Sequence, residues 1–372
     1  MLTRGVPVNG VSHRAGTLSA AQVPYASTAA RLPGLDVLKA VMIVAVVCIH
    51  STLFYYFAAR PFAGMNGWVV LFDVYILIVS AAVPSLLAVS LYLYDGRRLT
   101  DPGYFGRRLA RVACIIAFWW PSYIVVGWAV GYRGFTRDLV GVLTMPVTDG
   151  GLYFLGTLAL LTLISEALVR IRERVSARAS VNITVLMLVL CYTVVLLANE
   201  YLPVALVHVR KLITLGPLMF LPIAPAVFLI AIGPSHGRAL AGIATASVAF
   251  EGLFLWQSGV ITNVAAGVRG NYYVMTYLHP LSSLVATALL CLALTRTESA
   301  PKSVELVARN SLGIYLVHIL VYPLVARLFA RPPFPVQGGL VAFNPFVFLV
   351  VAIATGCVVA LLQRTPARRF VR

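Results

Sequence analysis

Charged residues are scarce in this sequence, and acidic residues are the scarcest of them. Only 11% of the 372 residues are charged while 60% are apolar, and 12 Asp and Glu stand against 29 Lys and Arg. A soluble protein of this size cannot bury so much apolar surface. The composition therefore argues against an ordinary soluble domain.

The first thirty or so residues lack an apolar run. They contain Gly, Ser, Ala, Pro and Arg instead, which argues against a cleaved signal peptide. We expect residues 1–33 to form a mobile cytosolic tail. A membrane domain would follow at 34–363, and a basic cytosolic tail at 364–372.

The five cysteines lack the spacing of a CxxC motif or a metal site. All of them fall inside apolar runs, so we interpret them as small lipid-buried residues and predict no metal. An internal repeat is also missing, which argues mildly against the transporters that are built from inverted repeats.

Apolar runs of roughly 20 residues, the length that crosses a bilayer, dominate the rest of the chain. They predict an all-α, polytopic integral membrane protein of about ten helices. The expected spans are 37–58, 68–94, 110–131, 151–169, 181–199, 212–232, 239–257, 274–294, 311–328 and 341–363. The sixth contains Pro217, Pro222 and Pro225, so we expect it to be kinked or broken.

The basic residues orient the spans. If the N-terminus is cytosolic, most of the 29 Lys and Arg fall in cytosolic segments, and the positive-inside rule then places both termini in the cytosol. Because topology explains these charges, no nucleic-acid partner is predicted.

Ionisable side chains inside a span are costly and usually functional. The clearest cases are His50, Asp73, Glu251 and His318. Three others lie near cytosolic helix ends, where we expect them to snorkel to the interface: Asp36, Lys39 and Glu166.

His50 lies roughly 20 Å from the inner end of the first span, and Glu251 roughly 18 Å into the seventh. Asp73 lies just inside the outer end of the second span. An imidazole held by a carboxylate is the usual arrangement for a general base. The alternative is a neutral histidine that only bonds across helices, and the spacing does not separate the two.

Two sets of cations lie on the predicted cytosolic side. Lys39 and His50 differ by only about 20° around the helix and by about 16 Å along it, which suits a long anionic ligand. Arg108 and Arg111, one turn apart, would make a phosphate clamp. As alternatives, Lys39 is an ordinary positive-inside anchor and the arginines serve topology or contact lipid headgroups.

Four stretches, in order along the chain, resemble motifs of the membrane acyltransferase 3 family. They are "RLPGLDVLKAVMIVAVVCIH" at 31–50, "RLAR" at 108–111, "LYFL" at 152–155 and "NSLGIYLVH" at 310–318. The chain departs from the family at two positions: Lys39 stands where arginine is usual, and Tyr153 where tryptophan is common. Lysine keeps the charge but loses the bidentate fork.

The resemblance implies a multi-pass enzyme of the cell (inner or plasma) membrane. It would transfer an acyl group, often acetyl, from cytosolic acyl-CoA to a hydroxyl of a carbohydrate, a glycoconjugate or another cell-surface acceptor. Acyl-CoA would be a co-substrate, with no permanently bound cofactor.

The resemblance also implies roles for single residues. His50 would be the catalytic base, with Asp73 or Glu251 as its candidate partner. The CoA phosphates would be held by Lys39, Arg108 and Arg111. The matched motifs add Asp36, Tyr153 and His318 as supporting residues.

Two other readings stay open at this point. A proton-coupled secondary transporter would use Asp73, Glu251 and His50 as a relay, although a relay does not need the paired cations. A non-catalytic scaffold would not need intramembrane charges at matching depth. The acceptor, the acyl chain length and the oligomeric state do not follow from the sequence.

Overall fold

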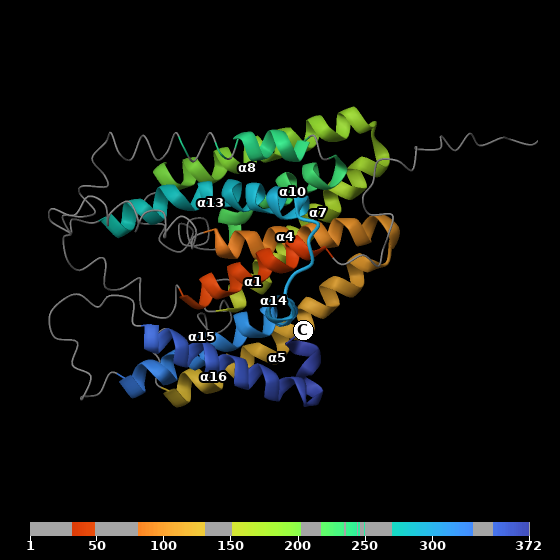
Figure 1. Cartoon of the computed structure of the whole chain (residues 1–372). Helices are drawn as coiled ribbons and strands as arrows, with labels where there is room; N and C mark the ends of the chain where they lie inside the picture. Colours follow the sequence, from red (N-terminus) through yellow and green to blue (C-terminus); the bar gives the residue numbers. More distant parts are fainter. Residues whose placement is uncertain are drawn as a thin grey trace, which may run out of the picture.

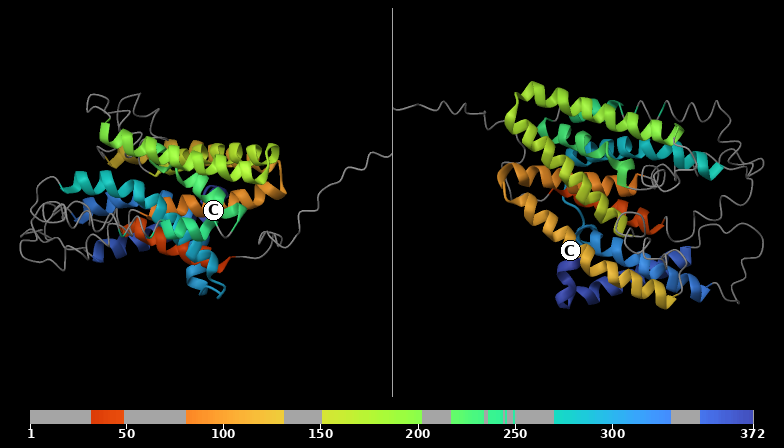
Figure 2. Two further views of the ribbon diagram at one scale, coloured as in Figure 1. Left: turned by 90° about the horizontal axis from the view of Figure 1, so that it is seen from above. Right: turned by 180° about the vertical axis from the view of Figure 1, so that it is seen from behind.

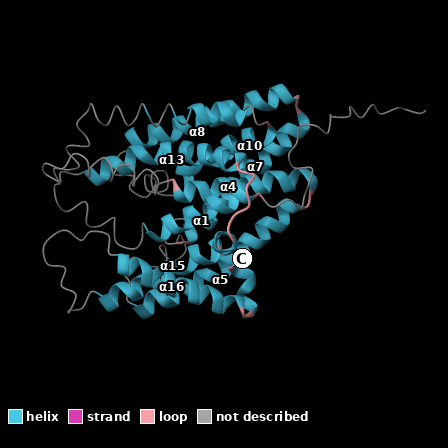
Figure 3. Cartoon of the chain, viewed as in Figure 1, coloured by secondary structure: helices cyan, strands magenta, loops and turns pink. Residues whose placement is uncertain are grey.

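Helices make up all the regular structure of the described chain. The computed structural model describes residues 32–48, 81–130, 151–201, 217–233, 236–243, 270–329 and 345–371, together with Thr245 and Ala249. Within these residues there is no strand (Figure 3). The all-α prediction is confirmed for this part of the chain.

The α-helices are α1 (Pro33–Cys48), α4 (Ala82–Thr100), α5 (Tyr104–Val130), α7 (Leu152–Arg174), α8 (Ala177–Tyr201), α10 (Ile223–Ile232), α13 (Gly270–Thr295), α14 (Lys302–Arg309), α15 (Ser311–Phe329) and α16 (Pro345–Gln363). Two short 3₁₀ helices are η5 (Pro217–Phe220) and η6 (Pro366–Phe370).

Helices α1 and α4 lie at the centre of the bundle (Figure 1). Helix α1 packs against α4, α13, α14 and α15, and α4 also contacts α7 and α10. In the front and rear views, α8 lies along one edge, and α5, α15 and α16 group at the opposite edge (Figures 1 and 2). Every residue from Ile223 to Ala231 of α10 is buried, as expected of a helix that is apolar all round.

Several helices are suited to a lipid environment. Among the described residues, three are long and apolar enough to cross a membrane, or four if α14 and α15, bent by 69°, count as one span. Helix α8 also exposes Leu186, Val189, Leu190 and Val194, which water would disfavour. These features suggest a multi-pass membrane protein. The count of about ten spans and the cytosolic termini stay predictions.

The predicted interruption of the sixth span is present. A 3₁₀ turn, η5, precedes α10, and Pro222 lies at the N-cap of α10. Proline lacks the N–H that an uninterrupted helix would require in its interior, so the chain restarts the helix there.

The helix ends near the predicted cytosolic side differ from the expected span ends. Helix α4 continues to Thr100, α5 already starts at Tyr104, and α7 continues to Arg174. Hydropathy marks only the apolar part of a helix. Ion pairs such as that of Arg170 with Glu166 stabilise the charged turns beyond it.

Gly34 allows α1 and α13 to approach closely. A Cβ at this position would overlap the backbone carbonyl oxygen of Ala293 and come within 3.0 Å of the Arg296 Cβ. Since that carbonyl belongs to the backbone, it cannot move aside as a flexible side chain would. The packing therefore requires glycine in the turn that also carries Asp36 and Lys39.

Candidate functional site

The three predicted catalytic residues lie outside the described residues. These are His50, Asp73 and Glu251. The described part of α1 ends at Cys48, two positions before His50. The roles of these three residues stay predictions.

Asp36 and Lys39 form an ion pair on α1, with 3.3 Å between the Lys39 Nζ and Asp36 Oδ1 atoms. The Asp36 residue is only 7% exposed, whereas 23% of the Lys39 side chain is exposed. The expectation that Asp36 snorkels to the interface is therefore wrong. It is buried beside a lysine that keeps access to the surroundings.

Arg108 is held by α4 and α7. Its Nε donates to the Thr162 hydroxyl at 3.2 Å, and its Nη2 donates to the Ser90 hydroxyl at 2.9 Å and to the Ser90 carbonyl oxygen at 3.2 Å. Its guanidinium carbon also lies 5.1 Å from the centre of the Tyr94 ring. These bonds fix the orientation of Arg108 at the junction of three helices.

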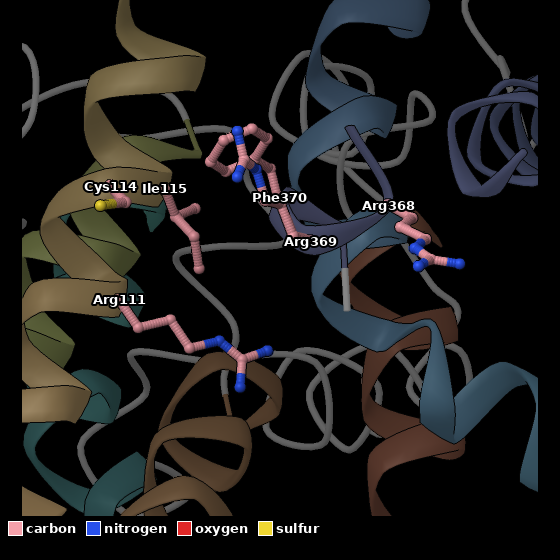
Figure 4. A pocket seen from close by; sticks show the side chains of 6 residues that line it. All are labelled: Arg111, Cys114, Ile115, Arg368, Arg369 and Phe370. Carbon is pink, nitrogen blue, oxygen red and sulfur yellow. The ribbon is translucent and has the colours of Figure 1, made fainter. Parts of the chain in front are cut away.

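Arg111 lies in a different environment. It lines a cavity of about 540 Å³ between α5 and η6 (Figure 4). The other lining residues are Cys114, Ile115, Arg368, Arg369 and Phe370. Three arginines from segments far apart in the sequence therefore share one cavity.

The predicted clamp of Arg108 and Arg111 is thus divided between two environments. Positions three apart on a helix differ by about 60° around its axis, which is enough to send long side chains to different neighbours. Arg108 reaches α4 and α7, and Arg111 reaches the cavity. Donor binding by either residue stays a prediction.

The sequence analysis missed Arg368 and Arg369 as partners of Arg111. It assigned them to a basic cytosolic tail. No local pattern could have joined them to α5, because a contact such as that of Trp119 with Phe370 connects positions 251 apart. A pair of arginines followed by an aromatic residue near the end of the chain is the only hint that the sequence contains.

A buried ionic network joins α4 and α7. The Arg98 Nε and Nη2 atoms donate to the two carboxylate oxygens of Glu166 at 2.7 and 3.0 Å, and the Tyr94 hydroxyl donates to the same carboxylate at 2.7 Å. The Arg170 Nε donates to it as well, at 2.8 Å. Glu166 is only 4% exposed. The expectation that it snorkels is therefore wrong, and it connects the two helices instead.

Asp95 lies next to this network and is fully buried. Its Oδ1 accepts a hydrogen bond from the Ser165 hydroxyl, while its Oδ2 has no hydrogen-bond partner among the described residues. The end of α4 thus carries one buried acidic residue, Asp95, that the sequence analysis did not single out.

Tyr153 and His318 are linked through Tyr315. The Tyr153 and Tyr315 side chains lie close together, and the ring centres of Tyr315 and His318 are 5.7 Å apart. His318 is fully buried, and its Nδ1 lies 3.0 Å from the carbonyl oxygen of Ile314. Two stretches of the family resemblance, one on α7 and one on α15, therefore meet in space.

Asn310 lies at the bend between α14 and α15. Its side-chain amide donates to the Leu306 carbonyl oxygen at 2.9 Å, and its own side-chain oxygen accepts from the Gln363 amide. The first residue of the "NSLGIYLVH" stretch thus connects the bend to the end of α16.

No cluster of three or more His, Cys, Asp or Glu residues suited to a metal ion occurs in the described part of the chain. The five cysteines are free thiols, and of these Cys114 and Cys357 are exposed.

A family model described as an acyltransferase domain matches residues 32–363. No curated protein and no solved structure matches the chain. The match includes the Asp36–Lys39 pair, Arg108 and Arg111 of α5, and the Tyr153–Tyr315–His318 contact, and it covers most of the sequence. The chain therefore belongs to the membrane acyltransferase 3 family.

Proposed function

We propose that the protein is a membrane O-acyltransferase. It transfers an acyl group, with acetyl as the first candidate, from cytosolic acyl-CoA to a hydroxyl of a carbohydrate or another cell-surface acceptor. The observation that carries this proposal is the acyltransferase match over residues 32–363. The cations at Lys39, Arg108 and Arg111 support an anionic donor.

In the proposed reaction, His50 takes the proton from the acceptor hydroxyl. The hydroxyl oxygen then forms a bond to the thioester carbonyl carbon, and the carbon–sulfur bond breaks. CoA leaves as a thiol once its sulfur has received the proton. A general base of this kind typically contributes about 10²–10⁴-fold to the rate.

The donor would lie with its phosphates at the cytosolic edge. Guanidinium groups match phosphate oxygens in a bidentate manner, and a basic entrance raises the local concentration of an anionic substrate. The pantetheine arm would then run along α1 toward His50. This placement rests on the helix face that the sequence predicts Lys39 and His50 to share.

The purified protein tests the proposal directly. Incubation with acetyl-CoA labelled in the acetyl group should release free CoA thiol, and the label should appear on a hydroxyl acceptor. Mass spectrometry of surface glycans from cells with and without the gene identifies that acceptor class. An absence of thioester consumption with every hydroxyl acceptor supplied would reject the acyltransferase.

A further inference from the structure

Three arginines line the cavity between α5 and η6. Arg111 extends from α5, while Arg368 and Arg369 extend from η6 (Figure 4). Among the lining residues that the structure describes, none carries a carboxylate. Within the described residues, no ion pair involves Arg368 or Arg369. A concentration of positive charge in one cavity favours an anionic ligand.

The two C-terminal arginines are on an anchored segment. The Trp119 indole N–H of α5 donates to the Phe370 carbonyl oxygen at 3.0 Å. The Phe370 ring stacks on Phe118, with 4.3 Å between the ring centres and 8° between the planes. Val371 is fully buried. The cavity therefore has two fixed walls.

Two further contacts shape η6 itself. The Thr365 hydroxyl accepts a hydrogen bond from the Ala367 backbone N–H at 3.2 Å, which caps the 3₁₀ turn. The Arg369 guanidinium carbon lies 4.9 Å from the centre of the Phe370 ring. The ring thus holds this guanidinium in place without supplying a negative charge.

The chemistry of the cavity points to phosphate. Arginine presents N–H donors in a fork that matches phosphate oxygens, and it has no acceptor atom. A volume of about 540 Å³ lies within the range of small-molecule sites, about 300–1,000 Å³. Several arginines around one cavity suit an anion of more than one charge better than a single carboxylate.

We propose that Arg111, Arg368 and Arg369 form a phosphate-binding pocket, which makes η6 part of the acyl-CoA donor site. This inference rests on the proposed function, in which Arg111 contacts the donor. The pocket takes the phosphate end of CoA. An anionic phospholipid headgroup offers the same chemistry, so the experiment must separate these two sources.

The test compares acetyl-CoA affinity in the full-length protein purified in detergent. The variant is the double substitution Arg368→Gln/Arg369→Gln. The matched control is Arg309→Gln/Arg364→Gln, which removes the same charge from two exposed arginines that do not line the cavity. Thermal unfolding of each variant checks that the fold is retained.

We expect the Arg368→Gln/Arg369→Gln variant to bind acetyl-CoA about 10- to 150-fold more weakly, the range for a lost charged hydrogen bond. The control should bind like the wild type. At saturating acetyl-CoA the variant should retain its turnover, because the phosphates lie far from the reacting carbonyl. Arg368→Lys/Arg369→Lys should lose less affinity, since the charge remains.

A second measurement tests whether the pocket binds an anionic phospholipid instead of CoA. Native mass spectrometry measures bound phosphatidic acid in the wild type and the double variant. Unchanged acetyl-CoA affinity with loss of phosphatidic acid overturns the donor assignment in favour of a lipid site. Unchanged binding of both ligands overturns the pocket.

Failure of the proposed function gives a different result. A wild type that consumes acetyl-CoA, with a double variant of equal affinity, overturns only the assignment of η6 to the donor site. A wild type that neither binds nor consumes acetyl-CoA overturns the proposed function and the donor site together.

Discussion

His50 is the residue on which the proposed chemistry depends. A histidine in the apolar first span is costly unless polar groups surround it, and its pKa range suits proton transfer near neutral pH. We expect His50→Ala to lower the rate of acyl transfer by about 10²–10⁴-fold while the protein still inserts and folds. Turnover is measured with labelled acetyl-CoA. Size-exclusion chromatography of the purified variant checks that it is folded. Near-normal turnover in a well-folded variant would remove His50 from the mechanism.

Lys39 tests the donor side of the predicted first span. Its ammonium group pairs with Asp36 at 3.3 Å but stays partly exposed, so it can also reach an anionic ligand. Lys39→Ala should raise the KM for acetyl-CoA more than it lowers kcat, because the phosphates are remote from the chemistry. Lys39→Arg should preserve or improve the affinity, because arginine adds the bidentate fork. Equal KM values for all three proteins would leave Lys39 as a topological anchor.

Glu166 is the residue whose loss should most disturb the fold. Its buried carboxylate accepts hydrogen bonds from Arg98, Tyr94 and Arg170. Removing one partner of a buried ion pair costs about 3–5 kcal/mol, since the remaining charge stays desolvated. Glu166→Ala should therefore clearly lower the midpoint of thermal unfolding of the protein purified in detergent.

Glu173 provides the matched control for that substitution. It also lies near Arg98, at 3.5 Å, but its side chain is 55% exposed. Glu173→Ala should cost no more than about 1 kcal/mol, as for other exposed ion pairs. Equal losses in the two variants would show that burial does not decide the contribution of Glu166.

At the scale of the elements, the approach of α1 to α13 depends on one glycine. The Cβ of Gly34→Ala would overlap a backbone carbonyl, so the two helices would have to separate. Overpacking of this kind costs about 1–3 kcal/mol. We expect a lower thermal midpoint and, because Lys39 is on the same helix, a higher KM for acetyl-CoA.

Gly106 of α5 is the control for this effect, since no atom lies within 4 Å of a Cβ built there. In an open helical position, alanine stabilises by about 0.4–1 kcal/mol because it restricts the unfolded chain. Gly106→Ala should therefore raise the thermal midpoint slightly. A Gly34→Ala protein as stable as Gly106→Ala would contradict the close packing of α1 on α13.

At the scale of the whole molecule, the distribution of charge predicts the topology. Both termini should be cytosolic, because most Lys and Arg then face the cytosol. Single cysteines at Ser12 and Arg372, in a protein without its native cysteines, should react with an impermeant maleimide only after the cells are permeabilised. A cysteine at Thr136, in a predicted outer loop, should react in intact cells.

Labelling of the C-terminal cysteine in intact cells would imply an odd number of spans. It would also place Arg368 and Arg369 on the side opposite to acyl-CoA. The topology experiment therefore bears on the donor pocket as well as on the count of spans.

Local patterns were sufficient for much of this protein. Apolar runs predicted helices at 110–131 and 151–169, and α5 and α7 cover all but one residue of each range. Prolines predicted the break before α10, because a missing N–H acts on its own turn. The helix ends were predicted less well, since charged turns such as the one that carries Arg170 are stabilised by ion pairs that hydropathy does not register.

The amino-acid sequence by itself determined the helical class, the membrane character and the family, because these depend on composition, run length and ordered motifs. Only the tertiary structure decided which polar residues meet. It separated Arg108 from Arg111, buried Glu166 against Arg98, and placed Arg368 and Arg369 across a cavity from α5. The physical reason is range: hydropathy and helical period act over a few turns, whereas the contact of Trp119 with Phe370 joins residues 251 positions apart.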